Sequence, residues 1–303
     1  MIDTIDIGSL TKKIRLSKKL SLKDVAGDYL SVSFLSKFER GESEISLSRF
    51  LCILENLDVS IEEIYGILSK DNPTRTEELL ARVSKAFQQN NIPALKKYYY
   101  EEIEKFNSTH KKIFLYNSIL IDSFLISITG KKMNKKHIEV ISDYLFDVDQ
   151  WGKRELVILG NSMSAVPTNT LNLLIKEIIY KTTLFGNNEE NKKIKIDLIL
   201  NGISIFLERK ELNYAKFYID LFDTLTIPEV YLYERVEYNI LIGTYWILIG
   251  KIEVGKKKIE LALESLKNLG AENLLLMREN EYEELLNSII WHFLRSEERR
   301  VGK

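Results

Sequence analysis

The functional side chains near the N-terminus are mostly the positively charged ones of lysine and arginine. From position 12 to position 23 there are six lysines and arginines and no acidic residue, namely Lys12, Lys13, Arg15, Lys18, Lys19 and Lys23. The stretch from 41 to 72 is acidic by contrast, and the whole chain has a formal net charge of −1. A local cluster of cations in a nearly neutral chain favours contact with a polyanion such as a nucleic acid.

A second candidate set consists of four asparagines, each inside an apolar stretch with helical periodicity: Asn117, Asn161, Asn201 and Asn239. They recur at intervals of roughly 40 residues, the length of a two-helix repeat. Asparagine is unfavourable inside a helix, because its amide competes for backbone hydrogen bonds. An amide both donates and accepts, so this series could hold the backbone of an extended peptide. The alternative is chance, with the amides facing water.

Two further features extend this predicted ligand site. Arg154 lies two helical turns before the second asparagine, where its planar guanidinium could pair with a carboxylate of the ligand. Apolar residues between the amides could form pockets for side chains, namely Phe114, Ile158, Ile205 and Tyr245. Extended peptides are recognised through such pockets, so we expect the ligand to be a short, hydrophobic peptide.

Nothing in the sequence indicates a catalytic site. The three histidines, His110, His137 and His292, lack the spacing of metal ligands. Phosphate-binding loops, dinucleotide-binding glycines and nucleophile elbows are also absent from the sequence. We therefore expect no enzymatic activity, no metal and no cofactor. The single cysteine, Cys52, favours a reducing compartment, which predicts a cytoplasmic protein.

The elements that must position these residues are predicted to be helices throughout. Only four prolines occur among the 303 residues, so helix breakers are rare. Amphipathic periodicity predicts five short helices in residues 1–68 and about eleven helices beyond residue 75. The expected fold class is all-α, with an N-terminal helix-turn-helix bundle and a C-terminal solenoid of helical hairpins similar to TPR repeats. The most apolar stretch, 113–130, contains Asn117 and Asp122, which favours a buried core helix over a membrane span.

Composition also predicts the domain boundaries. Residues 1–68 form the expected DNA-binding domain, and residues 69–75 are the expected linker because Pro73 disfavours helix at the preceding residue. Residues 76–294 form the expected sensor and dimerisation domain. The segment 295–303 resembles translated sequencing-adapter sequence, so we set it aside as a suspected non-native tail.

Helix signals in residues 1–68 match a helix-turn-helix. Ser21 predicts the start of a helix at Leu22, and a short link leads to a third helix expected at 33–40, which Gly41 should end. The second helix of such a pair enters the major groove of DNA. An ordinary small helical bundle with an exposed basic face is the alternative.

Residue chemistry then suggests roles on DNA. Residues early on the third helix are placed to reach base edges, namely Ser33, Phe34, Ser36 and Lys37. Phe34 could contact a thymine methyl group or belong to the core. The other cations are expected to contact phosphates, namely Lys12, Lys13, Arg15, Lys23 and Arg40. Glu39 and Arg40 could instead pair with neighbouring residues and fix the helix end. Leu35, Phe38 and Phe50 are assigned to the core.

The same residues carry a family resemblance. Residues 31–46 read SVSFLSKFERGESEIS, and the phrase SKFERGESEIS resembles the start of Rgg-type regulators of Gram-positive bacteria. The wider match is to the Xre-type helix-turn-helix class. The later chain resembles Rgg proteins in helix count and in Trp151-Gly152 followed by Glu155-Leu156 and Asn161. The resemblance implies a dimeric regulator of the RRNPP class, many of which respond to short secreted peptides that re-enter the cell.

The sequence thus predicts a cytoplasmic homodimer that binds double-stranded DNA and a short hydrophobic peptide, without a membrane segment. The expected dimer interface comprises the late apolar helices at 231–249 and 274–294, because solenoid ends need a cap. The alternative function is a DNA-bound helical scaffold whose repeat domain only dimerises or binds a protein. The operator, the identity of the ligand and the sense of regulation are not encoded in recognisable motifs.

Overall fold

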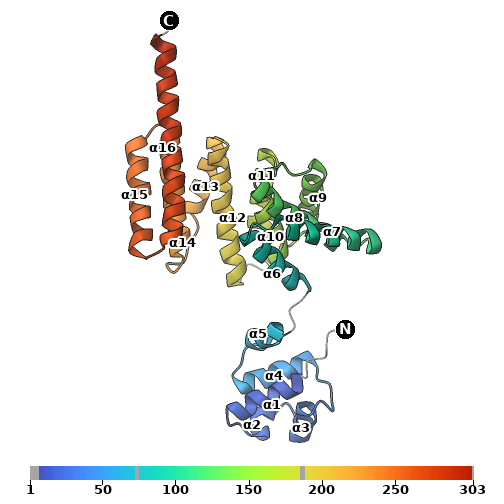
Figure 1. Ribbon diagram of the computed structural model, residues 1–303. Coiled ribbons are helices and arrows are strands. Elements are labelled where there is room, and N and C mark those ends of the chain that lie inside the picture. The colour runs from blue at the N-terminus through green and yellow to red at the C-terminus, as the bar shows by residue number, and fades with distance from the viewer. Residues whose placement is uncertain (1–6, 72–74, 185–187, 302–303) are drawn as a thin grey trace. The chain divides into compact units, whose positions relative to one another are not determined.

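The fold is all-α over the residues that the computed structural model describes, which are 7–71, 75–184 and 188–301. Sixteen helices and no strand occur in these ranges, which confirms the predicted fold class. The chain divides into two compact units, residues 1–88 and residues 89–303, which are described separately below (Figure 1).

The first unit contains six helices: α1 (Ile7–Ser17), α2 (Leu22–Ala26), α3 (Val32–Glu39), α4 (Leu47–Leu57), α5 (Ile61–Asp71) and α6 (Arg75–Gln88). Ser21 caps α2 in a capping box with Asp24. Ser31 accepts a hydrogen bond from Phe34 N at 3.2 Å, so α3 starts one residue before the predicted position. Gly41 ends the turn after α3 with a φ of +73°, as the glycine signal predicted.

Tight packing holds α2 and α3 in place. Leu35, Phe38 and Phe50 are buried, as predicted, together with Val25 and Ile53. The rings of Phe38 and Phe50 meet edge to face at 6.3 Å, so α3 and α4 share one core. This core fixes which face of α3 is left for a partner.

The segment expected to be a linker, residues 69–75, lies at the junction of two helices. Helix α5 continues to Asp71 and α6 begins at Arg75, so both ends of the expected linker 69–75 are helical. Residues 72–74, including Pro73, lie outside the described residues. Proline restricts only its own backbone and the residue before it, which leaves the flanking residues free to be helical.

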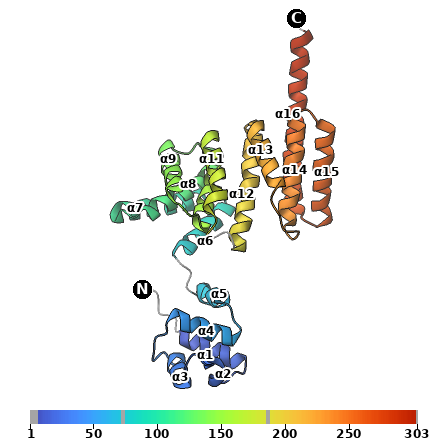
Figure 2. The ribbon, with the colours of Figure 1, turned by 180° about the vertical axis from the view of Figure 1, so that it is seen from behind.

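The second unit contains ten helices: α7 (Ile92–Thr109), α8 (Lys112–Thr129), α9 (Lys135–Asp147), α10 (Lys153–Ser162), α11 (Thr168–Lys181), α12 (Glu189–Glu208), α13 (Leu212–Asp223), α14 (Leu232–Leu248), α15 (Ile252–Asn268) and α16 (Glu272–Val301). Counted from α6, eleven helices follow residue 74 among the described residues, as predicted. Antiparallel neighbours such as α7 and α8, α12 and α13, and α14 and α15 pack as hairpins (Figure 2). Helices α8, α10, α12 and α14 pack in succession (Figure 1).

Helix α8 is, among the described residues, long and apolar enough to cross a membrane by length and composition. Ile119 and Ile121 on this helix are nearly inaccessible, and Ile119 belongs to the main core of the second unit. Trp151 lies in the same core, where its Nε1 donates to Leu145 O at 3.0 Å. The burial of its side chains gives α8 the role of a core helix, which is the role expected from its sequence.

The helices expected to form a dimer interface are used partly within the chain. On α14, Val236 and Ile247 are buried in a cluster shared with α15, and Leu241 is buried in the main core of the second unit. These side chains are used within the chain, and a dimer interface over 231–249 stays a prediction. On α16, Leu276 and Met277 are exposed, while the side chains of 289–294 lie outside the described residues. The backbone of residues 295–301, in the suspected tail, continues α16, and residues 302–303 are not described.

Candidate functional site

The predicted base-reading residues on α3 differ in their exposure to solvent. Ser33 and Lys37 are exposed, whereas Phe34 and Ser36 are half-buried. The Arg49 guanidinium of α4 lies 5.5 Å from the centre of the Phe34 ring, so this ring is covered on one side. The first unit therefore offers Ser33 and Lys37 as the freest side chains of the second helix of its helix-turn-helix.

Arg40 is occupied by neighbours at the end of α3. Its Nε donates to Glu42 and its Nη1 to Ser36 Oγ, at 2.7 and 2.6 Å. The hydrogen bond from Arg40 holds the pKa of the Glu42 carboxyl below its usual value. Both side chains of this ion pair are about half exposed, and such surface pairs contribute little to stability. A DNA phosphate could therefore displace Glu42 from Arg40 at a small cost in free energy. In the structure, the contact of Arg40 with Glu42 instead fixes the end of the helix.

Arg15 requires a correction. Its Nε and Nη2 donate to both carboxylate oxygens of Glu39 at 2.7 Å, and its Nη1 donates to Leu20 O. The hydrogen bonds that Arg15 donates to Glu39 raise the pKa of Arg15, which keeps the guanidinium charged. With the Arg15 side chain 9% and that of Glu39 3% exposed, the predicted phosphate contact for Arg15 is wrong. Arg15 instead joins α1 to the end of α3 through a buried ion pair.

The remaining predicted phosphate ligands are accessible. Lys12 and Lys13 on α1 and Lys23 on α2 are exposed. Lys18 is directed elsewhere, because its Nζ donates to Asp58 O at 2.7 Å. Exposed lysines are suited to contact a DNA backbone, and their role on phosphates stays a prediction.

Substitutions on these surfaces should separate sequence reading from general attraction to DNA. We expect Lys37→Ala to weaken binding to a specific site by about 1–3 kcal/mol, because a base contact would be lost. Lys13→Ala should weaken binding to all DNA and reduce its salt dependence by about one counterion. Fluorescence anisotropy with specific and random duplexes over a salt series measures both. Unchanged DNA affinity in a Lys12→Ala/Lys13→Ala double variant would contradict the assignment.

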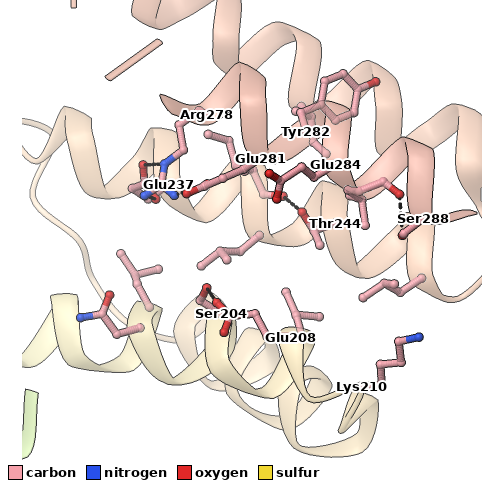
Figure 3. Close-up of a pocket in the computed structure, with 18 of the residues that line it drawn as sticks. Ser204, Glu208, Lys210, Glu237, Thr244, Arg278, Glu281, Tyr282, Glu284 and Ser288 are labelled. Carbon is pink, nitrogen blue, oxygen red and sulfur yellow. Dashed lines mark hydrogen bonds and ion pairs between the residues drawn. The ribbon is translucent and has the colours of Figure 1, made fainter. Parts of the chain in front are cut away.

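A cavity of about 680 Å³ opens in the second unit between α12, α14 and α16 (Figure 3). Its apolar wall is formed by Leu200, Leu207, Ile240, Leu241, Leu248, Ile259 and Leu285. Its polar wall is formed by Asp197, Asn201, Ser204, Glu208, Lys210, Tyr233, Glu237, Thr244, Arg278, Glu281, Tyr282, Glu284 and Ser288. The volume lies within the range of about 300–1,000 Å³ typical of small-ligand sites, and the mixed wall is typical as well.

An ion-pair network crosses one end of this cavity. Arg278 of α16 donates from both Nε, at 2.9 Å, and Nη2 to the carboxylate of Glu237 on α14, and it also pairs with Glu281. Burial raises the pKa of Glu237, and Arg278 opposes that shift. Burial also raises the pKa of Asp197 on α12, where Lys193 opposes the shift. These charges fix α14 and α16 relative to each other at the mouth of the cavity.

The structure does not bring the predicted asparagines together on the cavity. Asn201 lines it and is exposed. Asn161 donates from its Nδ2 to Val157 O within its own helix, and Asn239 is half-buried outside the cavity wall. Tyr245 packs against the core beside Ile242 and Leu248. Contacts of these residues with a peptide stay a prediction.

Asn117 requires a correction of its predicted role. It is only 7% exposed, its Nδ2 donates to the buried Glu102 at 2.8 Å, and its Oδ1 faces Arg154 Nη2 at 3.4 Å. The amide is buried and directed to the chain's own groups, so it does not face a groove open to a peptide backbone. Asn117 is a structural residue between α7, α8 and α10.

Arg154 is half-buried beside aromatic residues. The rings of Tyr116 and Tyr144 lie 4.1 Å apart, and burial together with a hydrogen bond to Glu155 raises the pKa of Tyr144 to about 12. The contact of Arg154 with Asn117 is long, and no carboxylate within the described residues forms an ion pair with Arg154. Its guanidinium therefore keeps donors for a ligand, and its pairing with a ligand carboxylate stays a prediction.

Sequence reasoning missed Glu237 and Arg278. Their pairing depends on the packing of α16 against α14, for which the sequence offered no local signal. Among the described residues, no group of three or more His, Cys, Asp or Glu side chains could hold a metal ion.

Both units are similar to known proteins. A family model described as the C-terminal domain of the HTH-type transcriptional regulator Rgg matches residues 94–280, and a helix-turn-helix model matches residues 12–64. The structure is similar to the SHP pheromone receptor Rgg2 of Streptococcus dysgalactiae, with 30% identity and a TM-score of 0.78 over 92% of this chain and 99% of that one.

More distant structures share the fold. A protein of Listeria monocytogenes EGD-e that is described as a transcriptional regulator has 19% identity and a TM-score of 0.80, over 93% of this chain and 98% of that one. PrgX in its complex with cCF10 has 19% identity and a TM-score of 0.74, over 93% of this chain and 92% of that one.

Proposed function

The chain belongs to the Rgg family of helix-turn-helix transcriptional regulators, and we propose that a short peptide bound by its second unit controls its action on DNA. The observation that carries this proposal is the cavity between α12, α14 and α16, which has the size and the mixed wall of a ligand site. The relative at 30% identity is a pheromone receptor, which favours a peptide as the ligand.

The apolar part of the cavity supports a hydrophobic peptide. Leu200, Leu207 and Leu241 form a buried wall on α12 and α14, and Asn201 and Ser204 lie beside it on α12. Apolar side chains of a peptide would gain about 1.5–3 kcal/mol each on burial against such a wall. The amide and hydroxyl groups beside this wall would form hydrogen bonds with part of the peptide backbone.

We also propose an oligomeric state and a cellular location for the chain. We expect the chain to act as a homodimer in the cytoplasm, because a helix that reads one half-site gains affinity by pairing across a two-fold symmetric operator. The exposed Leu276 and Met277 on α16 are available to such an interface. Sedimentation of the full chain at micromolar concentration measures this assembly, and a strict monomer with and without DNA would contradict it.

The test of ligand binding uses peptides from the host itself. Full-length protein is incubated with conditioned host medium, repurified, and the retained peptides are identified by mass spectrometry and then synthesised. Calorimetry should show that Asn201→Ala costs about 1–3 kcal/mol of affinity for the retained peptide, because a peptide amide loses its partner. Asn56→Ala, whose amide binds Val25 O in the first unit, is the matched control. Absence of any retained peptide would favour the scaffold function.

A further inference from the structure

Carboxylates outnumber cations on the wall of the cavity. Five acidic residues line it, namely Asp197, Glu208, Glu237, Glu281 and Glu284, against two basic residues, Lys210 and Arg278. An excess of negative charge in a concave, partly apolar site raises the local concentration of cations and disfavours anions. The charge of the wall therefore selects among ligands, independently of their apolar side chains.

Three of these carboxylates are already paired with cations of the chain. Glu237 and Glu281 hold Arg278 between them. Asp197 lies 3.4 Å from the Lys193 amine. These residues consequently fix the shape of the cavity more than they attract a ligand.

Glu208 and Glu284 are the carboxylates that remain. Both are exposed, and within the described part of the chain neither forms an ion pair. Glu208 only accepts a hydrogen bond from Ser204 Oγ at 3.2 Å. Figure 3 shows that they come from opposite walls, Glu208 from α12 and Glu284 from α16. A cation that enters between them would gain from both walls at once.

We propose that this cavity takes the cationic end of a short apolar peptide, with an ammonium group between Glu208 and Glu284. The apolar residues that follow lie against Leu200, Leu207 and Leu248. This inference rests on the proposed function and names the part of the ligand that the cavity recognises. An N-terminal amine, whose ordinary pKa is about 7.7–8.0, carries the required charge at neutral pH, as does a lysine side chain. A ligand carboxylate at this position would face like charges.

The test uses three synthetic pools of hexapeptides whose random positions are Leu, Ile, Val or Phe. The first pool has a free N-terminus and a C-terminal amide, and the second is N-acetylated with lysine at the first position and a C-terminal amide. The third is N-acetylated with a free C-terminal carboxylate. Full-length protein is mixed with each pool at about 0.1 M salt, where screening is moderate, and the retained peptides are measured by mass spectrometry after gel filtration.

We expect the wild-type protein to retain at least one cationic pool about fivefold to tenfold more than the anionic pool. The first and second pools distinguish a terminal amine from a lysine side chain as the source of the charge. Glu208→Gln/Glu284→Gln should abolish the preference. The matched control is Glu264→Gln/Glu283→Gln, which removes the same charge from exposed residues that do not line the cavity, and it should keep the preference.

The remaining outcomes separate this inference from the proposed function. Equal retention of all pools, or a preference for the anionic pool, overturns the inference and leaves a peptide-binding regulator in place. A cationic preference that survives in Glu208→Gln/Glu284→Gln overturns the assignment to these two carboxylates. Retention of no pool by the wild-type protein overturns both the inference and the proposed peptide binding.

Discussion

Replacing Arg15 with alanine is expected to lower the free energy of unfolding of the first unit by about 3–5 kcal/mol. In the native protein both oxygens of Glu39 accept hydrogen bonds from Arg15, and the pair is almost fully removed from water. Alanine would leave a buried carboxylate without its counter-ion, and this desolvation accounts for most of the loss. Domains are stable by only about 5–15 kcal/mol, so α1 and α3 should open frequently and DNA affinity should fall.

Hydrogen exchange of the full chain measures this effect without isolating the unit. Amides of α1 to α4 should exchange at least about a hundredfold faster in Arg15→Ala, as a loss of about 3 kcal/mol implies. Lys13→Ala removes an exposed cation from the same helix and should leave protection unchanged. The double variant Arg15→Met/Glu39→Leu should recover most of the protection, because it removes both charges. Wild-type protection in Arg15→Ala would show that the ion pair does not hold α1 to α3.

Filling the cavity should abolish the response to ligand. We expect Ser204→Trp to reduce peptide affinity at least about a hundredfold, because an indole on α12 occupies the space beside Leu200 and Leu207. Exclusion of two apolar side chains of the ligand forfeits about 3–6 kcal/mol, which corresponds to more than that factor. The protein should stay folded, since the indole enters a cavity of about 680 Å³ and displaces no core residue.

The matched control for this variant is Ser265→Trp, which adds the same side chain to an exposed position of α15 outside the cavity. Calorimetry with the host peptide gives the affinities, and DNA binding without peptide should be the same in both variants. Ligand binding by Ser204→Trp at the wild-type affinity would place the peptide elsewhere, with the face around Arg154 as the next candidate.

Local sequence signals predicted the helices well, because they act within a few residues. Ser21 and Ser60 cap α2 and α5 through hydrogen bonds that span three residues, and Gly41 adopts the left-handed conformation that its place after α3 requires. The eleven helices from α6 onward follow from hydrophobic periodicity and short polar breaks in the same way.

Pairing between distant residues was not predictable from these signals. The partner of Arg15 is 24 positions away, and a cluster of cations gives no indication that one of its members turns inward. A spacing of about 40 residues places asparagines in equivalent repeats but does not fix which side of each helix they occupy. Asn117 accordingly lies in a buried network with Glu102, while Asn201 faces the cavity. The network of Glu237 and Arg278 depends on the packing of α16 against α14, which no local pattern encodes.

We propose above all that a ligand in the second unit controls DNA occupancy by the first. It is tested most directly by genome-wide immunoprecipitation of the full-length protein from its host, with and without the host peptide. We expect discrete sites with a two-fold symmetric motif and a peptide-dependent change in expression of adjacent genes. The sites should be lost in Lys37→Ala, and the peptide response alone should be lost in Ser204→Trp. Occupancy no greater than that of an untagged control, or an unchanged peptide response in Ser204→Trp, would contradict it.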